Sequence, residues 1–374
     1  MRITIGTPQR DYATVRNILS PVPDVEQIRT KNVFRYPNYL LFKGFGRIDP
    51  LLANLHWGAR DCDLLHFFNM ASLGKTPWVT TFETALPRWE ETHPAAIGFG
   101  LKLLAGKSCK RLIAMSECAR AFQGAVLADY PDLAEAIQAK VTVLHPPQSP
   151  LIDGPKPGPS TSEPIRFVIV GADFFRKGGG EVLRVFDRLL QEGAAIRLTI
   201  VSTLQHGDYA SRATAADLAE ARRVIAAWPG HIVHFERLPN DQVLELFRSS
   251  HVALLPTWAD TYGYSVLEAQ AAGCPVLTTD VRALPEINDD AHGWVLPVPR
   301  NDRGNAVLGT PAERARFAQM LEGQIEAAIR SVLADPAMIA AKGAASLARI
   351  KAKHSPSAYG LRLREIYDEA LADG

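Results

Sequence analysis

The chain has 374 residues, 47% of them hydrophobic and 22% charged, with a formal net charge of +1. This length accommodates two domains of about 100–200 residues each, and the composition is that of a folded globular protein. The small net charge argues against wholesale binding to nucleic acid. The four cysteines form no C-x-x-C pair, which argues against a zinc knuckle and suits a reducing compartment.

The N-terminal sequence MRITIGTPQR contains one short strand-like run. It offers no apolar stretch long enough for a signal peptide or a membrane span. We therefore expect a cytoplasmic protein.

Short apolar runs alternate with helical patterns in the first half, which predicts a parallel sheet built from βαβ units. The expected strands are 2–6, 63–68, 78–82, 111–115 and 141–144. The stretch 21–49 has no clear period, so no element is predicted there.

Residues 149–164 are rich in proline and glycine, a composition that cannot build a core. We predict a first domain over 1–150, a linker over 151–164 and a second domain over 165–354. A helix over 355–374 closes the chain.

The second half is more regular. Its expected strands are 166–171, 196–201, 231–235, 252–255 and 275–278. Its expected helices are 179–191, 241–249 with Asn240 as N-cap, 265–272 and 311–334, followed by two more.

The stretch from His251 to Ile287 carries the most chemistry. A buried strand ends near Pro256, a loop with Asp260 and Gly263 follows, and a helix starts at Ser265 with Glu268 in its first turn. A helix N-terminus favours a phosphate, and the two carboxylates could hold sugar and ribose hydroxyls on either side of it.

Two plainer interpretations stay open for these carboxylates. Ser265 and Glu268 have the spacing of a capping box, in which the glutamate reaches back to the cap N–H. Asp260 alone could cap its own loop.

A second candidate cluster precedes the helix over 179–191. Arg176 and Lys177 stand directly before Gly178, Gly179 and Gly180. Adjacent cations ahead of a helix start suit a diphosphate. The alternative is a solvent-facing basic turn.

These two stretches resemble motifs of the family-four retaining glycosyltransferases. From Asp260 to Val276 the sequence resembles the family's E-x7-E region, with Asp260 in place of the first Glu and Glu268 as the second. From Val170 to Gly178 it resembles the V-G-R-x-x-x-x-K-G motif. Lys177 falls on the family's phosphate-binding Lys, whereas Ala172 stands where the family has Arg, a loss for which Arg176 could compensate.

The first half is similar to the family at fewer positions. Glu83 stands near the place where many relatives have His-Asp or His-Glu, although the His itself is missing. His66 and His145 are interpreted as structural rather than catalytic histidines.

The resemblance implies a GT-B fold: two facing Rossmann-like domains with a cleft between them, the donor bound by the second and the acceptor by the first. It implies as well that the final helix, 355–374, packs back on the first domain. It also implies a retaining, metal-independent transfer of sugar from a nucleotide-diphosphate donor, UDP- or GDP-linked, to a glycan or lipid-linked acceptor. The donor is a substrate, and no cofactor or metal is expected. Asp61-Cys-Asp63 is interpreted as a surface turn rather than a D-x-D metal motif.

The implied roles fall on eight residues. Asp260 and Glu83 are assigned to the catalytic centre, Arg176, Lys177, Gly263, Tyr264 and Ser265 to the donor phosphates, and Glu268 to the donor ribose. Two other interpretations remain: a nucleotide-sugar epimerase or hydrolase, and a non-catalytic nucleotide-sugar-binding module.

The charge of the N-terminal region suggests a surface partner. Residues 1–60 hold nine Lys and Arg against four Asp and Glu, and Phe99–Arg111 interleaves apolar and basic residues. Such a surface could make weak peripheral contact with an anionic membrane. The alternatives are a solvated basic face and an ordinary amphipathic helix packed on the sheet.

Overall fold

A computed structural model of the chain describes residues 2–372, except 59–60, 90–92, 161 and 208. The chain divides into two compact units. Unit 1 comprises Met1–Pro147 and His354–Gly374, and unit 2 comprises Gln148–Lys353.

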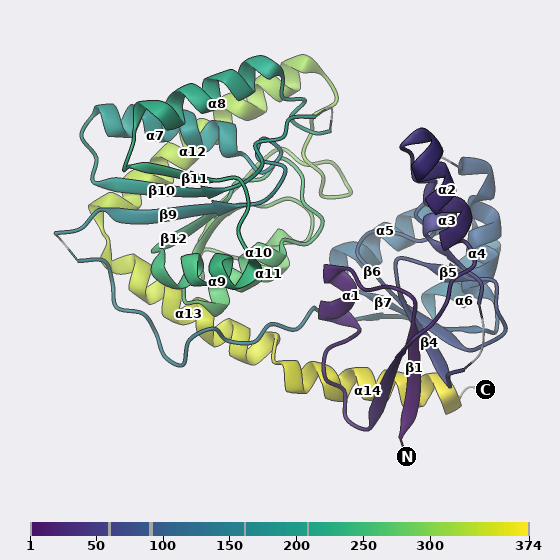
Figure 1. Cartoon of the computed structure of the whole chain (residues 1–374). Helices are drawn as coiled ribbons and strands as arrows, with labels where there is room; N and C mark the ends of the chain where they lie inside the picture. The colour runs from purple at the N-terminus through teal and green to yellow at the C-terminus, as the bar shows by residue number, and fades with distance from the viewer. Residues whose placement is uncertain (1, 59–60, 90–92, 161, 208, 373–374) are drawn as a thin grey trace. The chain divides into compact units, whose positions relative to one another are not determined.

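Unit 1 is built on a six-stranded sheet with the order β2-β1-β4-β6-β7-β8, in which all neighbouring strands are parallel (Figure 1). The strands are β1 (Ile3–Thr7), β2 (Val25–Arg29), β4 (Leu64–Phe68), β6 (Trp78–Phe82), β7 (Cys109–Ala114) and β8 (Val141–Val143). The sequence predicted five of them to within two residues at each end. It missed β2, because this edge strand contains no buried residue and so lacks an apolar run.

Successive strand residues face opposite sides, so both faces of this sheet are buried. One face packs on α4 (Ile97–Ala105), α5 (Glu117–Leu127) and α6 (Pro131–Gln138). The other face packs on α14 (Pro356–Ala372), whose Leu363, Ile366 and Tyr367 lie against Ile5, Leu64 and Ile113. The last helix of the chain therefore belongs to the core of unit 1.

A buried hydrogen-bonded chain joins α14 to this sheet. His66 lies between the Tyr367 hydroxyl, 2.7 Å from its Nδ1, and the Thr81 hydroxyl, 2.8 Å from its Nε2. Burial lowers the pKa of His66 to about 3, so the ring is neutral at ordinary pH. His66 thus fills the structural role expected of it.

Helix α4 decides between the two interpretations of Phe99–Arg111. Ile97, Leu101 and Leu104 are buried in the core of unit 1. The helical part, residues 99–105, is therefore packed on the sheet, and residues 109–111 begin β7. The apolar residues that were expected to face a membrane are buried in the core instead. In the part of the chain that the structure describes, no helix is long and apolar enough to cross a membrane.

The stretch 21–49, for which the sequence predicted no element, contains a helix as well as β2. Besides β2 it forms α2 (Arg35–Phe45), followed by α3 (Pro50–Ala53) and a short parallel pair, β3 (Leu55–His56) with β5 (Ala71–Ser72). No residue of α2 is buried. Its aromatic side chains cannot show a core-facing period, because the helix has no core face.

Unit 2 contains a second parallel sheet with the order β11-β10-β9-β12-β13-β14. Its strands are β9 (Ile165–Val170), β10 (Ile196–Val201), β11 (Ile232–Phe235), β12 (Val252–Leu255), β13 (Val276–Thr279) and β14 (Trp294–Leu296). Its helices are α7 (Gly179–Gln191), α8 (Ala215–Ala227), α9 (Asn240–Ser249), α10 (Tyr264–Ala271), α11 (Leu284–Ile287), α12 (Pro311–Ala334) and α13 (Ala337–Lys353). Helices α7, α8 and α12 cover one face of this sheet, and α9, α10 and α13 the other (Figure 1).

Several details of unit 2 differ from expectation. Strand β14 and helices α8 and α11 were not among the predicted elements. Helix α9 begins at Asn240, with Pro239 as its N-cap and no capping side chain, so Asn240 is not the cap. The proline-rich segment is held along unit 2: the Leu151 N–H donates to the Ala271 carbonyl at 2.8 Å, and Lys156 donates to the carbonyls of Phe247, Arg248 and Ser250. Proline restricts such a segment but leaves its other polar groups able to bond to a neighbour.

Candidate functional site

The order of strands in unit 2 reverses at β9. Strand β10 lies on one side of β9 and β12 on the other. The loops that follow β9 and β12 therefore leave neighbouring strand ends, and this position is where open α/β sheets bind their ligands. Every donor-site residue predicted from the sequence falls on these two loops or on the helix α10 behind the second.

Hydrogen bonds join the two loops. The carbonyl of Arg176 accepts from the Trp258 N–H at 2.8 Å and from the Thr257 hydroxyl at 3.0 Å. The Trp258 indole in turn donates to the buried carboxylate of Glu181 at 3.2 Å. These contacts fix the backbone from which the charged side chains project.

Glycines allow the loops to approach this closely. Gly178 has φ +79°, and a Cβ on it would lie 2.1 Å from the Pro256 carbonyl oxygen. A Cβ on Gly171 would lie 2.2 Å from Cδ of Lys177, whose side chain passes directly over that glycine. The glycines therefore set the path of Lys177 toward the second loop.

Lys177 and Asp260 form an ion pair at the centre of this arrangement. Lys177 Nζ lies 2.7 Å from Asp260 Oδ2, and the two side chains are only 15% and 13% exposed. Burial by itself raises the pKa of Asp260, but the attraction of Lys177 and Arg176 outweighs it and holds the pKa below its ordinary value. Asp260 is thus an ionised carboxylate that is oriented by Lys177, and it also accepts a hydrogen bond from the backbone of Thr261 in its own loop.

Arg176 lies next to this pair but is held by other groups. Its Nε donates to Asp173 at 2.8 Å, and its guanidinium also donates to the Ala259 carbonyl. It contributes to lowering the pKa of Asp260, so its charge acts at the site. This observation is compatible with Arg176 replacing the arginine lost at Ala172, which stays a prediction.

Helix α10 settles the capping question at Glu268. The N-cap is Gly263, at φ +91° and without a capping side chain, and Tyr264 is the first helical residue. Ser265 is therefore the second helical residue, and the capping-box interpretation of Ser265 and Glu268 is wrong. Glu268 is 8% exposed.

Glu83 belongs to unit 1 and follows β6. Its backbone N–H donates to Asn69 Oδ1 at 3.2 Å, Asn69 Nδ2 donates to its carboxylate at 3.3 Å, and Arg88 forms an ion pair with that carboxylate. Asn69 follows β4 in the left-handed conformation, with φ 58°. Glu83 is therefore a fixed acceptor at the carboxyl edge of the unit 1 sheet.

Sequence reasoning missed the supporting residues. Thr257, Trp258 and Glu181 hold the unit 2 loops, and Asn69 holds Glu83. Asn69 directly follows a buried strand, a position that could have marked it. Among the described residues, no group of three or more His, Cys, Asp or Glu side chains is placed to hold a metal ion.

Two glycine substitutions separate the stability cost of the close approach at Gly178 from the cost of its positive φ. Gly193 has a similar φ of +84°, and no atom lies within 4 Å of the place that an added Cβ would take there. We expect Gly193→Ala to cost about 1–2 kcal/mol of unfolding free energy from φ alone. Gly178→Ala should cost about 1–3 kcal/mol more, because its Cβ meets a backbone oxygen. Denaturant unfolding of both variants measures the difference, and equal losses would contradict the close packing of the two loops.

Comparison with known proteins shows what the segment that carries the site is similar to. Residues 155–307 match the profile of "Glycosyl transferases group 1". Glycogen synthase of Mycobacterium tuberculosis is 28% identical over 189 residues, 50% of this chain and 38% of that protein. A D-inositol 3-phosphate glycosyltransferase of Acidothermus cellulolyticus is 29% identical over 120 residues, 32% of this chain and 25% of that protein. The chain thus aligns with well under half the length of these relatives.

The fold is shared with solved structures over nearly the whole chain. Anabaena Alr3699/HepE in complex with UDP aligns with a TM-score of 0.60 at 12% identity, covering 98% of this chain and all of that one. This likeness confirms the predicted GT-B architecture of two Rossmann-like domains. The profile match spans the loops that carry Lys177 and Asp260, so this part of unit 2 is similar to the group 1 glycosyl transferases.

Proposed function

We propose that the chain is a retaining, metal-independent glycosyltransferase that moves a sugar from a nucleotide-diphosphate donor, UDP- or GDP-linked, to a glycan or lipid-linked acceptor. The observation that carries the proposal is the Lys177–Asp260 pair at the β9–β12 strand ends, ahead of the N-terminus of α10 and inside the matched segment. Relatives carry the names of glycosyltransferases, and HepE was solved with UDP.

The proposed roles follow from charge and position. The donor diphosphate lies by Lys177, Arg176 and the first residues of α10, Gly263, Tyr264 and Ser265. Cations and helix N–H groups there offset the negative charge that develops on the departing diphosphate. Asp260 accepts from hydroxyls of the donor sugar, and the mostly buried position of its carboxylate strengthens those hydrogen bonds.

Two carboxylates complete the proposal. Glu268, projecting from α10, accepts from the ribose hydroxyls. Glu83, fixed by Asn69 and Arg88 in unit 1, contacts the sugar or the acceptor. The leaving phosphate oxygen takes the acceptor's proton in this mechanism, so no side-chain base is assigned.

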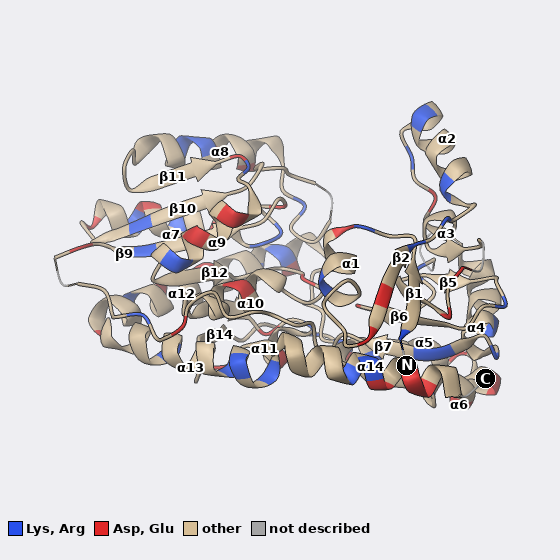
Figure 2. Cartoon of the chain, turned by 60° about the horizontal axis from the view of Figure 1, so that its bottom comes forward, with Lys and Arg blue, Asp and Glu red and all other residues tan. Residues whose placement is uncertain are grey.

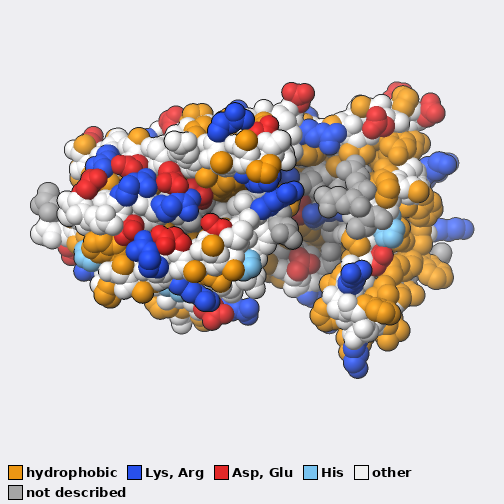
Figure 3. All heavy atoms as spheres, turned by 90° about the horizontal axis from the view of Figure 1, so that it is seen from above, with side chains coloured by type: hydrophobic (Ala, Val, Ile, Leu, Met, Phe, Trp, Pro, Cys, Tyr) orange, Lys and Arg blue, Asp and Glu red, His pale blue; other side chains and the backbone are white. Residues whose placement is uncertain are grey.

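Peripheral contact with an anionic membrane is part of the proposal, and its support now lies on α2 rather than α4. Residues 27–48 contain five Lys and Arg and no Asp or Glu. Helix α2 carries basic but no acidic residues (Figure 2), and hydrophobic side chains cover much of the surface of unit 1 in the view from above (Figure 3). Exposed apolar and basic side chains on one helix favour the interface of an anionic bilayer.

Two observations favour a non-catalytic nucleotide-sugar-binding module instead, namely Ala172 at the position of the family arginine and the missing family histidine near Glu83. A screen of UDP-, GDP- and ADP-sugars by thermal shift identifies the donor. Release of nucleoside diphosphate is then measured with and without acceptor, before and after EDTA. We expect acceptor-dependent release that survives EDTA.

The other outcomes of this experiment are distinct. Release without acceptor indicates a hydrolase, an isomerised sugar an epimerase, and binding without turnover a binding module. A reproducible requirement for added Mg²⁺ or Mn²⁺ contradicts the metal-independent mechanism.

Glu268→Ala should weaken binding of the nucleoside diphosphate because a carboxylate–hydroxyl contact is lost. The loss should be about 1.5–3 kcal/mol, or roughly 10- to 150-fold in Kd, measured by calorimetry. Glu245→Ala, at an exposed glutamate of α9, serves as the control and should leave Kd unchanged. If Glu268→Ala lowers stability but keeps the affinity, the ribose role fails.

Lys177→Ala and Arg176→Ala should both lower turnover, with the larger loss at Lys177. Removal of a preorganised cation from a leaving group typically costs about 100- to 1,000-fold in kcat. The exposed Lys353→Ala supplies a control of equal charge change in the same unit. Parent-like turnover of Arg176→Ala would show that Arg176 does not replace the arginine missing at Ala172.

A further inference from the structure

Unit 1 contains a cavity of about 770 Å³ that the proposed roles do not use. It is lined by residues 8–11 after β1, 29–32 at the end of β2, parts of α2 and α3, and Met70 after β4. Strand β1 has β2 on one side and β4 on the other, so the strand order of this sheet reverses at β1. The cavity thus lies at a carboxyl-end position of the kind that binds ligands in α/β folds.

Four cations line this cavity: Arg10, Arg29, Lys31 and Arg35. Their side chains form no ion pair with any residue that the structure describes. Other arginines of unit 1 do pair with carboxylates, as Arg88 does with Glu83 and Arg364 with Asp368. Cations gathered without counter-charges repel one another, and an anion in the cavity would relieve that repulsion.

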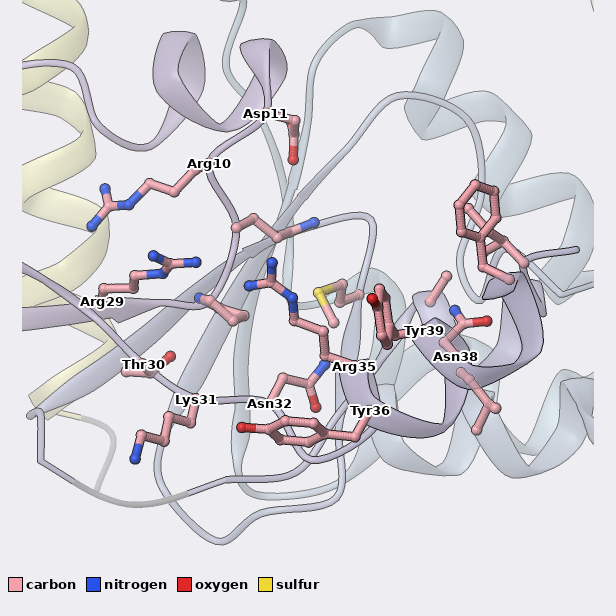
Figure 4. A pocket seen from close by; sticks show the side chains of 17 residues that line it. Arg10, Asp11, Arg29, Thr30, Lys31, Asn32, Arg35, Tyr36, Asn38 and Tyr39 are labelled. Atoms are coloured by element: carbon pink, nitrogen blue, oxygen red, sulfur yellow. The ribbon is translucent and has the colours of Figure 1, made fainter. Parts of the chain in front are cut away.

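The one carboxylate among the described lining residues is already used. Asp11 caps α1 (Tyr12–Asn17): it accepts from the Thr14 N–H at 2.9 Å and from the Thr14 hydroxyl at 3.0 Å. In Figure 4 the guanidinium groups of Arg10, Arg29 and Arg35 lie in the same part of the pocket. Guanidinium forks match the oxygens of a phosphate, and several together select it over a neutral hydroxyl.

The other part of the lining is apolar and aromatic. Tyr36, Tyr39 and Phe42 of α2 line the cavity and are 67%, 57% and 54% exposed. Large aromatic side chains left this exposed gain free energy when a ligand covers them. The cavity therefore offers a cationic end and an apolar end to a single ligand.

We propose that this cavity binds the phosphate ester of the acceptor, with the phosphate on Arg10, Arg29 and Arg35 and the less polar part of the molecule along α2. Naming the ligand as the acceptor rests on the proposed glycosyltransferase function; the phosphate site itself does not. The same chemistry is offered by a free sugar phosphate and by a phospholipid headgroup.

The full chain is tested by calorimetry with glucose 6-phosphate against glucose, and by co-sedimentation with vesicles of phosphatidylcholine with and without phosphatidic acid. The test variant is the double substitution Arg29→Gln, Arg35→Gln. Its matched control is Lys102→Gln, Lys107→Gln, which removes the same charge from two exposed positions of unit 1 that lie outside residues 27–48 and outside the lining of this cavity.

We expect the parent chain to bind glucose 6-phosphate more tightly than glucose, or to bind vesicles with phosphatidic acid more tightly than vesicles without it. The test variant should lose roughly 10- to 100-fold in affinity for that probe, and the control should stay within about twofold. Preference in solution identifies a free phosphate ester, and preference on vesicles alone identifies a lipid headgroup. Thermal melts of both variants check that each is folded, which is expected because the replaced side chains are exposed.

Equal weakening by the test and control variants would show general electrostatic attraction and overturn the proposal. No preference for phosphate in either arm would overturn it as well. These probes bind without a donor. If phosphate binding is intact but donor turnover is absent, the proposed function is rejected and the phosphate site is not.

Discussion

The ion pair between Lys177 and Asp260 is the interaction on which the unit 2 site depends. It joins the loops after β9 and β12 across the point where the strand order reverses, with its atoms 2.7 Å apart and both side chains mostly buried. A pair in this position keeps both charges in place before any ligand arrives, so little ordering is left for the moment of binding. Gly171 and Gly178 are required because the pair forms only where the two backbones and the lysine stem can pass at van der Waals contact.

The two units hold their charges in contrasting ways. In unit 2 the cations of the site have carboxylate or carbonyl partners, which orient them and set the ionisation of Asp260. In unit 1 the cations on the cavity beside α2 have no carboxylate partners among the described residues, and the helix next to them has no core face. The arrangement in unit 2 suits a ligand that reacts in the site, because a reaction requires charged groups at fixed positions. The arrangement in unit 1 suits binding of a ligand through its charge and its apolar surface, and such binding tolerates more variation in the structure of the ligand.

Much of this could be predicted from the sequence, for identifiable reasons. The central strands β4, β6, β12 and β13 are short apolar runs because they are buried on both faces, and α7 and α12 have the predicted bounds because each shows a helical period. Arg176 and Lys177 were singled out because they stand before glycines that follow a strand, and Asp260 because it follows another strand; their roles at a donor site come from the resemblance to family motifs and stay predictions. Strand β2 and helix α2 were missed because they bury nothing, and the cap of α10 was misassigned because a glycine in the left-handed conformation ended the loop before the serine. Contacts such as Trp258 with Glu181 join residues far apart in the chain, which local patterns do not reveal.

A crystal structure of the chain with bound UDP or GDP tests the central claim most directly. We predict that the diphosphate lies within hydrogen-bonding distance of Lys177 and the first turn of α10, with ribose oxygens on Glu268. A nucleotide bound elsewhere on unit 2, or one whose phosphates lie away from Lys177 while the ribose avoids Glu268, would contradict this claim.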